Sequence, residues 1–136
     1  MKTKSIKQQI SFAGSPGELY DIWLNPLKQE IITGGKVKIS KDPKGSFEAF
    51  DGYVHGYHME LIPGKKIEQA WYFAEDGWPE NHYSICTLLL AKTTGGCKIT
   101  FTQTGVPEHK VAALKEGWKT YYWKPIKQYL AMTKGK

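Results

Sequence analysis

The chain has 136 residues, of which 40% are hydrophobic and 24% charged, with a formal net charge of +6 at pH 7. All of the positive side chains are lysines, and because base readout and bidentate phosphate contacts favour arginine, we expect no nucleic-acid binding. There is no long apolar run and no signal-peptide pattern, which argues against membrane insertion and export. We expect a soluble, cytoplasmic protein with one domain over residues 1–136.

The N-terminal third predicts one strand followed by two short helices. Apolar residues alternate with polar ones over residues 3–12, as in a half-buried strand. Ser15 to Glu18 reads as a capping box with proline at the first helical position, which starts a helix. Asn25-Pro26 should divide the following apolar helical pattern into two helices, because the residue before proline avoids helical geometry.

From Lys36 onward the hydrophobic period changes to two, which predicts a sheet. The expected strands cover residues 37–39, 46–50, 53–62, 67–73, 82–91 and 97–104. Asp51-Gly52 suits a two-residue hairpin turn, and Pro63-Gly64 suits the next turn. Short connections of this kind join antiparallel strands.

The strand over residues 53–62 carries a conflict of side-chain direction. Pairing through Asp51-Gly52 points Val54 and Gly56 inward, whereas pairing past Pro63-Gly64 points Met59 and Leu61 inward. A β-bulge near residues 56–58 would reconcile the two and would bend the sheet.

The C-terminal segment from Pro107 to Met132 predicts a long helix with one aromatic face. Pro107 suits the first helical position. Pro125 leaves the carbonyl of Tyr121 without its helical donor, so we expect a kink near Tyr121.

These elements predict an α+β fold in which a curved antiparallel β-sheet wraps around the C-terminal helix, with two short helices after the first strand. The expected inward residues are Trp23, Phe47, Met59, Ile67, Gln69, Trp71, Phe73, Cys86, Leu88, Leu90, Ile99, Phe101, Gln103, Leu114, Trp118 and Tyr122. The last hairpin should place Cys86 opposite Gln103 and Cys97 opposite Lys92, too far apart for a disulfide. Free thiols fit a reducing cytoplasm.

A set of short motifs, built mainly around aromatic, glycine and proline residues, is distributed along the chain from about Ile6 to Leu130. It comprises Phe50-Asp51-Gly52, Leu61-x-Pro63, Lys66-Ile67, Trp71, Trp78-Pro79-Glu80-x-His82, Gly105-x-Pro107, Gly117-Trp118, Tyr121-Tyr122 and Ile126-Lys127-Gln128. In this the chain resembles the C-terminal domain of the activators of the Hsp90 ATPase, within the START-like (SRPBCC) superfamily. The resemblance implies the helix-grip fold.

The resemblance also implies two kinds of function. In the superfamily this fold often encloses a cavity for lipids, hormones or polyketides, and some branches are enzymes. In the activators, which act in the stress response, the domain assists binding to the chaperone, while much of the stimulation is attributed to a separate N-terminal domain. We expect no counterpart of that N-terminal domain in this chain.

Our first hypothesis is a START-like protein that binds a small hydrophobic molecule or lipid between the sheet and the C-terminal helix. The predicted pocket residues are Trp23, Phe47, Met59, Gln69, Trp71, Phe101, Gln103, Trp118 and Tyr122. The alternative is that these side chains are simply the packed core. Gln69 and Gln103 favour a cavity, because a buried amide needs partners that a ligand or water can supply.

The second hypothesis is a co-chaperone-like interaction module for an Hsp90-type ATPase. Trp78 lies on a loop and could anchor a partner, but the interpretation we prefer is that it folds back over the end of the sheet. Lys65 and Lys66 are the expected charged contacts with an acidic partner surface.

Catalysis, a metal and a cofactor have little support in the sequence. His55 and His58 are three residues apart on a strand, which sends them to opposite faces. No cysteine or carboxylate pair completes a ligand set, so no metal site is expected. No inward acid or base has an evident activating partner. We therefore expect a non-catalytic protein without a cofactor. A START-like enzyme is the third hypothesis, and it would need an acid or base inside the cavity.

Overall fold

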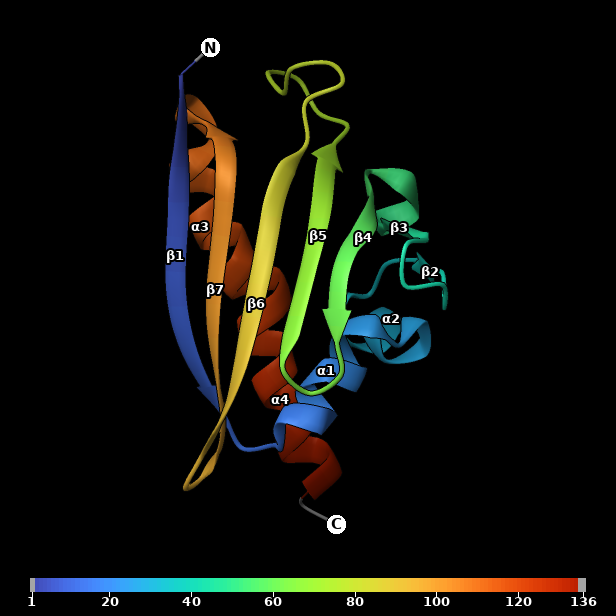
Figure 1. Ribbon diagram of the computed structural model, residues 1–136, viewed down its shortest axis with the longest axis vertical. Helices are drawn as coiled ribbons and strands as arrows, with labels where there is room; N and C mark the ends of the chain where they lie inside the picture. The colour runs from blue at the N-terminus through green and yellow to red at the C-terminus, as the bar shows by residue number, and fades with distance from the viewer. Residues whose placement is uncertain (1, 135–136) are drawn as a thin grey trace.

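The computed structural model describes residues 2–134 and shows a curved sheet lying against the C-terminal helix (Figure 1). All neighbouring strands are antiparallel, in the order β1-β7-β6-β5-β4-β3-β2. The elements are β1 (Thr3–Phe12), α1 (Pro16–Leu24), α2 (Pro26–Thr33), β2 (Lys38–Ile39), β3 (Ser46–Ala49), the 3-10 turn η1 (Phe50–Gly52), β4 (Val54–Ile62), β5 (Lys66–Phe73), β6 (Ser84–Thr93), β7 (Gly96–Pro107), the 3-10 turn η2 (Glu108–Lys110), α3 (Val111–Trp118), the π-helical turn η3 (Lys119–Trp123) and α4 (Lys124–Lys134). The predicted helix-grip architecture is confirmed.

The two short helices begin where the sequence places their caps. The hydroxyl of Ser15 accepts from the backbone N–H of Glu18 at 3.1 Å, and the Glu18 carboxylate accepts from the backbone N–H of Ser15 at 3.2 Å. Asn25 caps α2 through its side-chain oxygen, which accepts from the N–H of Lys28 at 3.2 Å. Gly34 ends α2 at φ +78°, a left-handed conformation that glycine adopts without strain.

The connection between β3 and β4 is longer than predicted, although the register is the predicted one. Ala49 and Val54 form the last pair, so a loop of residues 50–53 replaces the expected two-residue turn. Phe50 and Asp51 have φ values of +51° and +62°. Phe50 does not pair with β4. Its ring turns toward the C-terminal helix and packs edge-on against Tyr121, with 6.0 Å between the ring centroids.

The predicted bulge in β4 exists and lies slightly farther along the strand. Pairing with β5 shifts between His58 and Glu60, which makes Met59 the extra residue. His58 therefore takes the inward position, with 1% of its surface exposed. The prediction gave that position to Met59, which is half-buried.

The C-terminal helix starts later than predicted and contains a π-helical turn. Pro107 is the last residue of β7, and the first helical residues belong to η2. The irregularity expected near Tyr121 is η3, where the N–H of Lys124 donates to the carbonyl of Lys119, five residues back. In a regular α-helix the ring of Pro125 would crowd a carbonyl of the preceding turn. The wider π-helical turn makes room for the ring.

The β6–β7 hairpin has the predicted register. Cys86 lies opposite Gln103 and Cys97 opposite Lys92, and both thiols are free and buried. Among the helices of residues 2–134, none combines the length and apolarity needed to cross a lipid bilayer.

Candidate functional site

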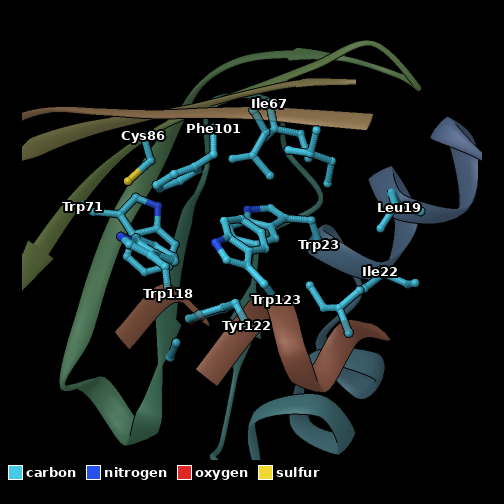
Figure 2. Close-up of a cluster of buried hydrophobic side chains, with 14 of the residues drawn as sticks. Leu19, Ile22, Trp23, Ile67, Trp71, Cys86, Phe101, Trp118, Tyr122 and Trp123 are labelled. Carbon is cyan, nitrogen blue, oxygen red and sulfur yellow. The ribbon is translucent and has the colours of Figure 1, made fainter. Parts of the chain in front are cut away.

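Four tryptophans from three parts of the chain meet beneath the sheet (Figure 2). Trp23 comes from α1 and lies 6.3 Å from Trp71 of β5, measured between ring centroids. On the C-terminal helix, Trp118, Tyr122 and Trp123 lie 6.2, 5.2 and 5.9 Å from the Trp23 ring. These rings fill the space at the centre of the fold.

The buried amide of Gln69 connects this cluster to β4. Its oxygen accepts from the indole N–H groups of Trp23 and Trp71, both at 3.0 Å. Its nitrogen lies 3.1 Å from Nδ1 of His58, and Nε2 of His58 lies 3.3 Å from the Ser40 carbonyl. These contacts fit a neutral imidazole with its proton on Nε2, and burial lowers the pKa of His58.

The second buried amide, Gln103, is also satisfied by protein groups. Its oxygen accepts from the Trp118 indole at 2.8 Å, and its nitrogen donates to the Ser84 hydroxyl at 2.9 Å. Two buried glutamines would indicate a cavity if their amides lacked partners within the protein. Their partners are indoles, a histidine and a serine, so neither amide needs a ligand.

An apolar groove of about 440 Å³ opens between the C-terminal helix and strands β4 and β5. Its lining residues are Phe50, Tyr53, Val54, Trp71, Phe73, Glu75, Lys110, Ala113, Leu114, Gly117, Trp118, Tyr121 and Tyr122. We call this space the aromatic groove. Its volume lies within the range of small-molecule sites.

The predicted pocket residues divide into three groups. Trp71, Trp118 and Tyr122 line the aromatic groove. Trp23, Phe47 and Gln69 lie deeper, with Trp71 and Tyr122, around a void of about 20 Å³, which is room for about one water. The remaining residues, which line neither space, are the fully buried Phe101 and Gln103 and the half-buried Met59.

The helical wall of the aromatic groove contains a glycine in the middle of the C-terminal helix. A Cβ atom added to Gly117 would meet no atom within 4 Å, and Ala113 lies one turn earlier. The predicted pocket residues do not include Ala113 or Gly117. The available signal was two small residues spaced by four on the helix.

One end of the aromatic groove carries an ion pair. The Lys110 ammonium lies 2.7 Å from the Glu75 carboxylate and donates to the carbonyl of Asp76, also at 2.7 Å. Partial burial and a hydrogen bond to Glu75 raise the pKa of Tyr53 to about 12. The groove is therefore apolar along its length and polar at this rim.

The predicted partner-binding residues do not form one surface. Trp78 is 6% exposed, packs against Phe73 and donates its indole N–H to the His82 carbonyl at 2.7 Å. This is the folded-back alternative. Lys65 is exposed, whereas Lys66 forms an ion pair with Glu60 at 2.6 Å.

The buried nucleophiles carry no sign of activation. Burial raises the pKa of Cys86 well above its usual value, so the thiol stays protonated. Burial likewise raises the pKa of Tyr122. Within residues 2–134, no group of three or more His, Cys, Asp or Glu side chains could hold a metal ion.

Comparison with known proteins gives a family model and curated relatives that match most of the chain. A family model described as "Activator of Hsp90 ATPase homolog 1-like protein" matches residues 13–131. The human "Activator of 90 kDa heat shock protein ATPase homolog 1" is 30% identical over 126 residues, which are 93% of this chain and 37% of the human protein. The Dictyostelium discoideum homolog is 30% identical over 120 residues, 86% of this chain and 30% of that protein. The chain thus spans about a third of the length of these relatives.

Solved structures support the fold. An HSP90 activator from Plasmodium falciparum has a TM-score of 0.74 at 18% identity, covering 98% of this chain and 96% of its own. A protein from Mesorhizobium loti has a TM-score of 0.82 at 17% identity, covering 96% of this chain and 98% of its own. At these identities the likeness establishes the fold alone.

Proposed function

We propose that this chain, which belongs to the Activator of Hsp90 ATPase homolog 1-like family, binds a small apolar or aromatic molecule in the aromatic groove. Trp71, Trp118 and Tyr122 line the groove from nearly buried positions, while the exposed rings of Tyr53 and Tyr121 offer stacking surfaces. The ion pair at the rim offers one polar contact. The chain acts by binding, without catalysis, and its free thiols suit the cytoplasm.

Gly117 is the observation that carries this proposal. Glycine inside a helix costs about 1 kcal/mol relative to alanine, and here no close neighbour requires its small size. A larger side chain at this position would project into the aromatic groove. The glycine therefore keeps the groove open at a cost in helix stability.

The proposal predicts a small molecule that copurifies with the protein and is displaced by filling the groove. Native mass spectrometry of protein from its own host should show an adduct that is released on denaturation. Gly117→Leu should lose the adduct while remaining at least as stable as the wild type, because leucine has the higher helix propensity. Glu116→Leu, one position away and exposed, is the matched control and should retain it. Absence of an adduct from the wild type, or its retention by Gly117→Leu, would contradict the proposal.

A second function, interaction with an Hsp90-type chaperone, is favoured by the names of the relatives. The test is the ATPase rate of a purified Hsp90-type chaperone with and without this protein. If Lys65 and Lys66 make the contact, stimulation should fall with rising salt and in the variant with Lys65→Glu and Lys66→Glu. Stimulation unchanged by this double reversal would rule out the lysine-mediated contact.

A further inference from the structure

Strand β1 forms a free edge of the sheet, with β7 on its other side (Figure 1). A groove of about 450 Å³ is lined on the strand side by the consecutive residues Gln8, Gln9, Ile10 and Ser11. Neighbouring residues of a strand point to opposite faces, so a hollow that touches four in a row follows the edge itself. The backbone N–H and C=O groups on such an edge can pair with another strand. We call this space the edge groove.

The opposite wall of the edge groove is basic. It consists of Lys119, Trp123, Lys124 and Lys127 from the C-terminal helix. The three lysines are exposed, and none takes part in an ion pair among the residues that the structure describes. Their charges are therefore available to a partner.

Two hydrogen bonds hold the walls of the edge groove together. The Trp123 indole donates to the side-chain oxygen of Gln8 at 2.7 Å, and the side-chain nitrogen of Gln8 donates to the Lys115 carbonyl at 3.2 Å. Strand and helix are thus fixed to each other before any partner arrives. A preformed site loses less conformational entropy when it binds.

We propose that the edge groove binds an extended acidic segment of a partner protein, which adds a strand to β1 and sets its carboxylates against Lys119, Lys124 and Lys127. Strand addition supplies backbone hydrogen bonds, and the lysines supply selectivity. A second copy of β1 is a poor occupant, because that strand carries Lys4 and Lys7 and no acidic residue. The stretch from Gln8 to Ser11 is about 10 to 13 Å long, enough to pair about four residues of a partner.

This proposal is independent of the small-molecule site. The residues that line the edge groove and those that line the aromatic groove do not overlap, because they lie on different faces of the C-terminal helix. A variant of one groove can therefore be tested without changing the other.

The first experiment measures binding of a fluorescent, end-blocked peptide of about eight residues that alternates valine and glutamate. The wild type should bind this peptide and not its valine–lysine counterpart. The double variant Lys124→Glu and Lys127→Glu should bind it at least about tenfold more weakly. The control Lys41→Glu and Lys92→Glu makes the same change in net charge at exposed lysines outside the edge groove, and should bind as the wild type does.

The second experiment separates strand addition from plain charge attraction. Two versions of the acidic peptide are N-methylated at alternate residues, so that each lacks the backbone donors of one edge. Only the version that lacks the donors facing β1 should lose binding, and the unmodified peptide should slow amide hydrogen exchange at residues 8–11. The proposal is overturned if the acidic peptide does not bind, if the reversed-charge variant binds it equally, or if both methylated versions bind alike.

Discussion

Replacing Trp118 with alanine should lower the free energy of unfolding by about 3 to 5 kcal/mol. The indole is 3% exposed and lies 4.6 Å from the Phe101 ring and 5.1 Å from the Trp71 ring, so its loss leaves a cavity that rigid neighbours cannot fill. The change also leaves the Gln103 oxygen without the indole donor, which adds a desolvation cost. Equilibrium unfolding in urea measures this loss.

Two further variants divide this effect into its parts. Trp118→Phe keeps most of the apolar volume and removes the indole donor, so it should cost about 1 to 3 kcal/mol. Tyr121→Ala removes a neighbouring ring that is 55% exposed, and it should cost much less than Trp118→Ala. A loss below about 1.5 kcal/mol for Trp118→Ala would show that the indole lines open space more than it supports the core.

Most of the fold could be predicted because its signals are local. The capping box at Ser15, the break at Asn25-Pro26 and the alternation along the strands each depend on residues within one turn or one hairpin. The same is true of the β6–β7 register, where counting outward from the turn places Cys86 opposite Gln103. These features need no knowledge of the rest of the chain.

The position of the bulge could not be predicted, because distant contacts decide it. A conflict of side-chain direction shows that β4 must contain an extra residue, but several positions would satisfy it. The structure places the extra residue at Met59, which turns His58 inward to meet Gln69 from the next strand and Ser40 from the β2–β3 loop. Neither partner is evident from the sequence around His58.

The helix face and the aromatic groove were partly missed for a related reason. One extra residue in the π-helical turn rotates the following residues by about 100° relative to a regular helix. Trp123 is therefore buried with Tyr122, while Tyr121 is exposed. The groove walls include Ala113 and Gly117, which patterns of large apolar residues do not detect.

Gln69→Leu should lower the free energy of unfolding by about 2 to 5 kcal/mol, although leucine is apolar and of similar size to glutamine. The change leaves the buried indole N–H groups of Trp23 and Trp71 without an acceptor, and Nδ1 of His58 without a donor. An unsatisfied buried polar group costs about 1 to 3 kcal/mol. Urea unfolding of the variant at neutral pH measures the loss. A cost below about 1 kcal/mol would mean that water replaces the amide.

Gln69→Glu tests the roles of the amide separately, through the pH dependence of stability. Burial lowers the pKa of His58 in the folded wild type. As pH falls through about 6.5, His58 is therefore protonated in the unfolded chain before it is protonated in the folded chain. Wild-type stability should therefore decrease below that pH. In Gln69→Glu the carboxylate still accepts from both indoles but cannot donate to Nδ1, and it favours a protonated His58 that donates to it. The variant should therefore gain stability, relative to the wild type, as pH falls from about 8 to 6. Parallel pH profiles for the two proteins would show that His58 and residue 69 are not coupled in this way.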